Sequence, residues 1–149
     1  MLPGPVGSFV VATALAFASA RRPALVPELE APLLPDTAMA EMTATGPVIF
    51  YNPTLFRAAG AARDFVRAHE YGHVLLGHLQ DEEMLSTDAG HSRAEAEADC
   101  FAARAVSREA TVAMARLVLG LPPEPRDRIY GTKPERAQRI LACGGIEHL

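Results

Sequence analysis

The chain lacks any stretch in which lysine and arginine gather. Its 14 basic residues are scattered along 149 positions and are outnumbered by 18 acidic ones, which gives a net charge of −4. Proteins that bind nucleic acid present a basic face to the phosphates, often with aromatic side chains between the cations. The composition therefore argues against a nucleic-acid partner. The sequence also has no internal repeats, which excludes a repeat architecture.

Long hydrophobic runs are lacking too. The apolar run at residues 9–17 is shorter than the roughly 20 residues that a membrane-spanning helix needs, so no stable span is expected apart from the N-terminal segment. Residues 1–20 carry no charge and end in Ala18-Ser19-Ala20, a pattern typical of a signal peptide cleaved near Ala20. This predicts a periplasmic or secreted protein. The lack of a positive charge near Met1 leaves an N-terminal membrane anchor or a cytoplasmic location as alternatives.

Cysteine is scarce, because the chain contains only Cys100 and Cys143. In an exported chain such an even pair can form a disulfide, here one that holds the C-terminal segment to an earlier helix. In the alternative interpretation, Cys100 is a small buried helix residue. The sequence leaves both interpretations open.

Proline, in contrast, is concentrated between residues 23 and 47. It fixes φ and removes a hydrogen-bond donor, so we expect residues 21–46 to form an extended lead-in to one globular domain over residues 47–149. β-branched and aromatic residues at 48–51 predict a strand. Helical periodicity, caps and turn residues predict the remaining elements: helices over 58–79, over 107–119 and from about residue 134, with an acidic loop over 81–90.

The most informative motif is His69-Glu70-Tyr71-Gly72-His73. On an α-helix, four residues advance about 6 Å and rotate the side chain by only about 40°, so both imidazoles leave the same face. They can occupy two corners of a zinc tetrahedron, and Glu70 then lies beside the open corner as a general base. A zinc site of this form hydrolyses peptide bonds.

A catalytic zinc site needs a third protein ligand, and Glu95 is the best candidate. Glu95 and Asp99 are four residues apart, so they share a helix face as the two histidines do. Asp99 can then accept a hydrogen bond from the second ring nitrogen of a ligating histidine. A competing interpretation is a capping box, in which Ser92 begins a helix and Glu95 reaches back to a backbone N–H. The metzincin pattern is disfavoured, because Leu76 and Leu79 occupy the positions of its glycine and third histidine.

These residues resemble the gluzincin metallopeptidases, whose pattern is His-Glu-x-x-His on one helix and Glu-x-x-x-Asp on the next. The string Glu-x-x-Ala-Asp that ends at Asp99 is similar to that of CAAX-endopeptidase and HtpX-type peptidases, and of bacterial neutral zinc metallopeptidases. Downstream, Thr132-Lys133-Pro134 with Arg139-Ile140 is similar to the Thr-His-Pro…Arg-Ile segment of the CAAX type, with Lys133 in place of the histidine. The resemblance covers residues 47–142.

The resemblance implies one Zn²⁺ per chain, with Glu70 as general base, Asp99 orienting a histidine, and three protein ligands, His69, His73 and Glu95. It also implies the fold of a zincin-like minimal metalloprotease domain. The expected fold class is α+β, mostly helical, with a small β-sheet beside the active-site helix. Zincins commonly bind an extended peptide along an exposed strand edge, so the strand at 48–51 can hold a peptide or protein substrate. In the alternative interpretation, it is an ordinary core strand.

A donor aimed at the tetrahedral intermediate is also needed, and the sequence does not choose among four candidates, His91, Tyr130, Lys133 and Arg139. We interpret His91 as a loop residue, His78 as a surface or core histidine, and Glu97 as a solvated carboxylate.

Two other functions fit the same residues. One is a catalytically inactive metal-binding or interaction module that keeps the constellation for stability. The other is a cytosolic regulatory protease that resembles the ImmA type, whose His-Glu-x-x-His sequence is similar.

Overall fold

The structure, a computed structural model, describes the chain except residues 1–25, 124, 126 and 148. The described part is a mixed α/β fold, mostly helical, with a three-stranded sheet. The predicted signal peptide, with its cleavage point near Ala20, lies outside the described residues. Among the helices that are described, none has both the length and the apolar character that crossing a membrane requires.

The sheet contains β1 (Glu28–Glu30), β2 (Ala38–Thr43) and β3 (Gly46–Tyr51) in the order β1-β3-β2. β1 runs parallel to β3, and β2 runs antiparallel to it. Gly46 closes the turn between β2 and β3 with φ 121°, a conformation that favours glycine because other residues carry a Cβ. β3 confirms the strand predicted at residues 48–51.

Seven α-helices follow the first strands in the described residues: α1 (Pro53–Ala58), α2 (Arg63–Leu75), α3 (Glu82–Ser86), α4 (Asp88–Ala105), α5 (Arg108–Gly120), α6 (Asp127–Tyr130) and α7 (Lys133–Cys143). α5 confirms the helix predicted over 107–119, and the hydroxyl of its N-cap, Ser107, accepts the N–H of Ala110 at 3.2 Å. α7 confirms the helix predicted from about residue 134. Its N-terminus is fixed by a capping box between Thr132 and Glu135.

The predicted lead-in over residues 21–46 is wrong in one respect, because β1 and β2 lie within it and pair with β3. The domain therefore begins before the expected boundary at residue 47. Pro32 and Pro35 fall in the connection between β1 and β2, where a missing N–H removes no ladder hydrogen bond. β3 is the central strand, so residues 48–51 form a core strand rather than a substrate edge, and the outer edges belong to β1 and β2.

Two helical predictions also need correction. The helix expected over 58–79 is shorter, because α2 ends at Leu75 and Gly77, with φ 79°, turns the chain into a 3-10 helix at His78–Gln80. The acidic segment over 81–90 contains α3 and the start of α4. Asp81 and Thr87, which the sequence marked as turn formers, act as the N-caps of these two helices.

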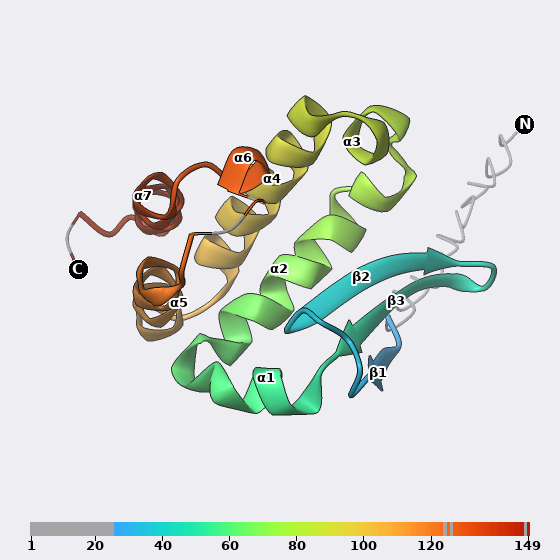
Figure 1. Ribbon diagram of the computed structural model, residues 1–149, viewed down its shortest axis with the longest axis horizontal. Coiled ribbons are helices and arrows are strands. Elements are labelled where there is room, and N and C mark those ends of the chain that lie inside the picture. Colours follow the sequence, from blue (N-terminus) through green and yellow to red (C-terminus); the bar gives the residue numbers. More distant parts are fainter. Residues whose placement is uncertain (1–25, 124, 126, 148) are drawn as a thin grey trace, which may run out of the picture.

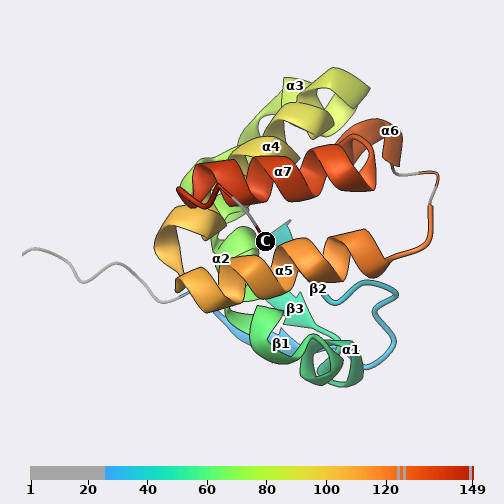
Figure 2. The ribbon, with the colours of Figure 1, turned by 90° about the vertical axis from the view of Figure 1, so that its left-hand side faces the viewer.

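α2 lies between the sheet and α4, and α3 lies at one end of this helix pair (Figure 1). α5 and α7 lie side by side and cover α2 and α4 from the side opposite the sheet (Figure 2). Gly72 makes the contact between α2 and α4 close, since a Cβ at this position would lie 3.2 Å from the Cα of Ala98. The close approach brings the His69–His73 turn of α2 next to the Glu95–Asp99 turn of α4.

Candidate metal centre

Three side chains from two helices converge at the contact between α2 and α4. Nε2 of His69 lies 3.1 Å from Nε2 of His73 and 3.1 Å from Oε2 of Glu95, and Nε2 of His73 lies 3.4 Å from Oε1 of Glu95. One ligand atom from each residue can be chosen so that all three lie within 4.8 Å of one another. The capping box with Ser92 is therefore wrong: α4 begins at Asp88 with Thr87 as its N-cap, and Glu95 lies inside the helix.

These separations fit a tetrahedral zinc ion. With metal–ligand distances of about 2.0–2.1 Å, the edges of the tetrahedron are about 3.3–3.4 Å long. The donor set of two imidazoles and one carboxylate is also one that catalytic zinc sites use. The residues present therefore fit the ion that the sequence predicts.

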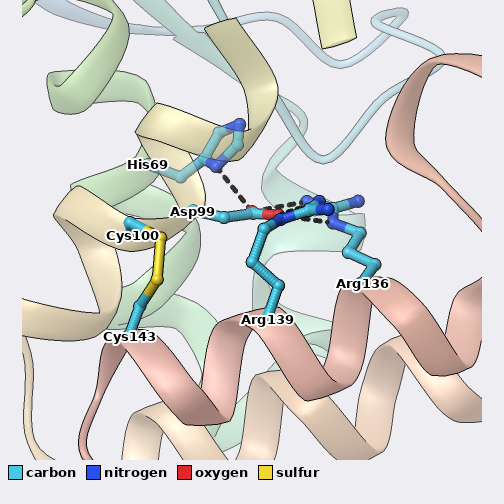
Figure 3. The surroundings of a disulfide bond; sticks show 6 residues. All are labelled: His69, Asp99, Cys100, Arg136, Arg139 and Cys143. Carbon is cyan, nitrogen blue, oxygen red and sulfur yellow. Dashed lines mark hydrogen bonds and ion pairs between the residues drawn. A yellow bond between two sulfur atoms is a disulfide. The ribbon is translucent and has the colours of Figure 1, made fainter. Parts of the chain in front are cut away.

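Asp99 lies behind His69, as the sequence predicts, and is completely buried. Its Oδ1 is 3.1 Å from Nδ1 of His69, although the ring N–H direction is not well aligned with that oxygen, so the contact is mainly one of charge attraction. Arg136 donates two hydrogen bonds to the carboxylate, from Nε and Nη2, both of 2.9 Å. Arg139 adds a third, of 3.2 Å from Nη2 (Figure 3). Two cations from α7 thus hold the buried carboxylate beneath the histidine.

Without a metal ion, this cluster stabilises a protonated His69. Burial disfavours the charged ring, but attraction to Asp99 and Glu95 outweighs this effect and raises the pKa of His69 to about 10. For Glu95, burial is opposed by its contacts with His69 and His73, and its pKa lies well below the usual range. Burial of Asp99 is likewise outweighed by His69 and Arg136, which hold its pKa well below the usual range. A metal ion would displace the proton from His69.

Glu70 lies at the interface between α2 and the sheet and is only 8% exposed. Its Oε2 accepts the backbone N–H of Ala40, on β2, at 2.7 Å. Burial raises the pKa of this carboxyl group, and the nearby rings of His69 and His73 oppose the shift without cancelling it. A carboxylate with a raised pKa is a better proton acceptor, which suits the general base that the sequence predicts.

His73 has a partner that the sequence did not suggest. Its Nδ1 lies 3.1 Å from Nδ1 of His78, which is 2% exposed. Nε2 of His78 in turn lies 3.0 Å from Oε2 of Glu97. Burial lowers the pKa of His78, so that its ring is neutral near pH 7. Glu97 is half exposed, in keeping with its interpretation as a solvated carboxylate, but it is also paired with His78.

The four candidates for stabilising the intermediate are placed differently. Arg139 is bound to Asp99, and Nζ of Lys133 forms a 2.8 Å ion pair with Asp127, so neither is directed at the cluster by these contacts. His91 is on α4 rather than in a loop, one turn before Glu95 and on the same helix face. Tyr130 is the last residue of α6, and its side chain lies outside the described part of the structure. His91 is thus the candidate that the helix geometry favours.

Cys100 and Cys143 form a disulfide with a Cα–Cα distance of 5.0 Å, which decides between the two interpretations of these residues. The bond joins α4 to the last residue of α7 (Figure 3). Cys100 is adjacent to Asp99, and α7 carries Arg136 and Arg139. The disulfide therefore ties the helix that bears both arginines to the helix that bears their carboxylate.

Sequence reasoning missed three contributors to the site: the backbone of Ala40, the guanidinium of Arg136, and the pair of His78 and Glu97. A backbone N–H carries no sequence signal. Arg136 stands three residues before Arg139 and so shares its helix face, a signal that could have indicated a joint role.

Comparisons of the chain with protein-family models, with curated proteins and with solved structures gave no match.

Proposed function

We propose that the protein is a zinc-dependent metalloendopeptidase with a zincin-like domain and a gluzincin ligand set. The observation that supports this most strongly is the convergence of His69, His73 and Glu95, each of which offers one ligand atom within 4.8 Å of the ligand atoms of the other two. The carboxylate of Glu70, on the same helix as both histidines, completes the set that hydrolysis requires.

Zinc held by three protein ligands keeps a position for water and lowers the pKa of that water to about 7. Glu70 would accept a proton from the water that such a metal ion activates, and its raised pKa suits this task. It then returns the proton to the leaving amine nitrogen. The N–H of Ala40 holds Oε2 of Glu70, so we assign Oε1 to the proton transfer.

The outer edge of β2 is suited to hold the substrate. Ile49, on β3, donates its N–H to the carbonyl of Pro27, on the β1 side of β3. Ala40 lies opposite Ile49 on β2, so the two residues exchange no backbone hydrogen bond, and the N–H of Ala40 points away from β3 to Glu70. The edge of β2 therefore faces the general base. An extended peptide added to this edge would gain backbone hydrogen bonds and pass the metal ligands.

We also propose that the protein acts in the periplasm or outside the cell. The disulfide between Cys100 and Cys143 supports this location, because disulfides persist in oxidising compartments and are rare in the cytosol. Sequencing the N-terminus of the mature protein tests it. A terminus just after Ala20 is the expected result, and an intact Met1 on a cytoplasmic protein would favour the regulatory protease instead.

The substitution Glu70→Gln tests the activity. We expect the full chain with this substitution to bind one zinc ion by elemental analysis, as the wild type does. Its cleavage of a peptide library, followed by mass spectrometry, should fall by about 10²–10⁴-fold, because the proton acceptor is lost. The matched control is Glu147→Gln, since Glu147 is exposed and distant in sequence from both metal helices.

Two outcomes would contradict the proposal. If Glu70→Gln cleaved the library as fast as the wild type, Glu70 would not be the general base. If the wild type bound zinc stoichiometrically and cleaved no peptide, the inactive metal-binding module would be the better interpretation.

A further inference from the structure

We propose that Glu97 and His78 act as positioning residues that fix the metal-binding nitrogen of His73. The inference rests on the proposed metal site and concerns how one of its ligands is prepared. The three side chains form a chain of contacts, with Oε2 of Glu97 3.0 Å from Nε2 of His78 and Nδ1 of His78 3.1 Å from Nδ1 of His73.

For a neutral ring of His78, one arrangement of protons satisfies both contacts. A carboxylate only accepts hydrogen bonds, so Nε2 of His78 carries the proton that Glu97 binds. The neutral ring of His78 then has an unprotonated Nδ1, which accepts a hydrogen bond. Nδ1 of His73 must therefore be the donor. Nε2 of His73 is left without a proton and with its lone pair directed at the cluster.

The other side of the His73 ring faces the cluster. Its Nε2 lies 3.1 Å from Nε2 of His69 and 3.4 Å from Oε1 of Glu95, the other two residues of the proposed metal site. The chain Glu97–His78–His73 thus presents an unprotonated nitrogen at the place that the metal ion would occupy.

The backbone places His78 for this role. α2 ends at Leu75, and the left-handed conformation of Gly77 turns the chain so that His78 begins the next 3-10 helix. The two rings meet with centroids 5.2 Å apart and planes inclined by 75°. Because His78 is 2% exposed, water does not compete for its Nδ1. The contact with His73 is therefore not an incidental surface pairing.

The two histidine ligands are held by different devices. Asp99 contacts Nδ1 of His69 directly, whereas a second imidazole separates His73 from its carboxylate. Outer partners of ligating histidines typically contribute 10–100-fold to metal affinity. We expect a loss of that size when the acceptor at His78 is removed.

Two matched pairs of variants of the full chain test the proposal. His78→Leu removes the acceptor, while His78→Asn keeps an oxygen close to the position of Nδ1. Glu97→Leu removes the carboxylate at a half-exposed position, while Glu97→Gln keeps an acceptor oxygen. Zinc affinity is measured by competition with a chromophoric chelator. Nitrogen-15 NMR of the imidazole rings in the metal-free protein reports which nitrogen carries the proton.

We expect His78→Leu to weaken zinc binding by about 10–100-fold and His78→Asn to restore most of it. In the metal-free wild type, His73 should be protonated at Nδ1, and in His78→Leu this preference should be lost. Glu97→Leu should give a mixture of His78 tautomers that Glu97→Gln largely corrects. Glu97 lies at the surface, so this pair provides a test even if His78→Leu fails to fold.

The proposal is overturned if both leucine variants bind zinc as tightly as the wild type, or if His73 of the wild type is protonated at Nε2. It is also overturned if His78→Asn is as weak as His78→Leu, since loss of packing would then explain the effect. A wild type that binds no zinc would instead refute the proposed metal site. The proton positions in the metal-free protein would still be measurable in that case.

Discussion

Cys143, the last residue of α7, is joined by a disulfide to Cys100, the neighbour of the buried Asp99 on α4. The bond closes the chain over a sequence separation of 43 residues and fixes α7 where its arginines reach Asp99. Stability and the geometry of the proposed metal site therefore depend on the same covalent link.

Replacing both cysteines by alanine should lower the free energy of unfolding by about 3–4 kcal/mol, because the disulfide closes a loop of this length and so reduces the entropy that the chain gains on unfolding. Urea denaturation of the metal-free protein measures the change. Treating the wild type with a reductant should reproduce it. Equal stability of oxidised and reduced wild type would show that the link does not constrain the unfolded chain.

Arg136→Met should destabilise the protein by about 3 kcal/mol, since the buried negative charge of Asp99 would lose two of the hydrogen bonds from arginine that compensate it. Zinc affinity should fall by about tenfold, because Asp99 orients His69. The control is Arg93→Met, whose partner Glu83 lies 3.4 Å away in an exposed ion pair, so that its loss should cost less than about 1 kcal/mol. Similar effects of the two variants in denaturation and zinc titration would contradict a special role for Arg136.

Gly72→Ala should destabilise the protein by about 1–2 kcal/mol, although alanine favours helix formation. The added Cβ would lie 3.2 Å from the Cα of Ala98, and that backbone cannot move without separating α2 from α4. Gly120→Ala is the control, because its Cβ would meet nothing within 4 Å and should stabilise α5 by about 0.5–1 kcal/mol. Thermal unfolding shows whether each substitution raises or lowers the stability of the protein. A stabilising Gly72→Ala would show that α2 and α4 have space between them for the added Cβ.

The stability of the metal-free protein should fall as the pH rises above neutrality. The pKa of His69 is raised from 6.5 to about 10, so its contribution is fully present below 6.5 and is lost progressively as the pH rises through about 10. Urea midpoints of chelator-treated wild type across this window measure the effect. His69→Gln should be less stable and should lose this slope. An unchanged slope in the variant would assign the titration to another group.

The positions of His69, Glu70 and His73, and of Glu95 and Asp99, could be predicted from local spacing. Each set lies within about one turn of a helix, and the period of 3.6 residues fixes which side chains share a face. The strand at 48–51 and the helix capped by Ser107 could be predicted for the same reason, because alternation and capping are local.

The partners of these residues could not be predicted in this way. β1 and β2 form only because β3 pairs with both, and a pairing between segments leaves little trace in either one. The sequence left Lys133 and Arg139 among four candidates for stabilising the intermediate, and the packing of α6 and α7 directs them to Asp127 and Asp99.

The sequence alone determined which donors face one side of each metal helix, because helical geometry depends on neighbours within a few residues. Only the tertiary structure decided that the two faces meet at Gly72, that Ala40 binds Glu70, and that His78 lies behind His73. Those contacts join residues brought together by packing, turns and hydrogen bonds between separate elements. Their energies depend on distances in space that spacing along the chain does not specify.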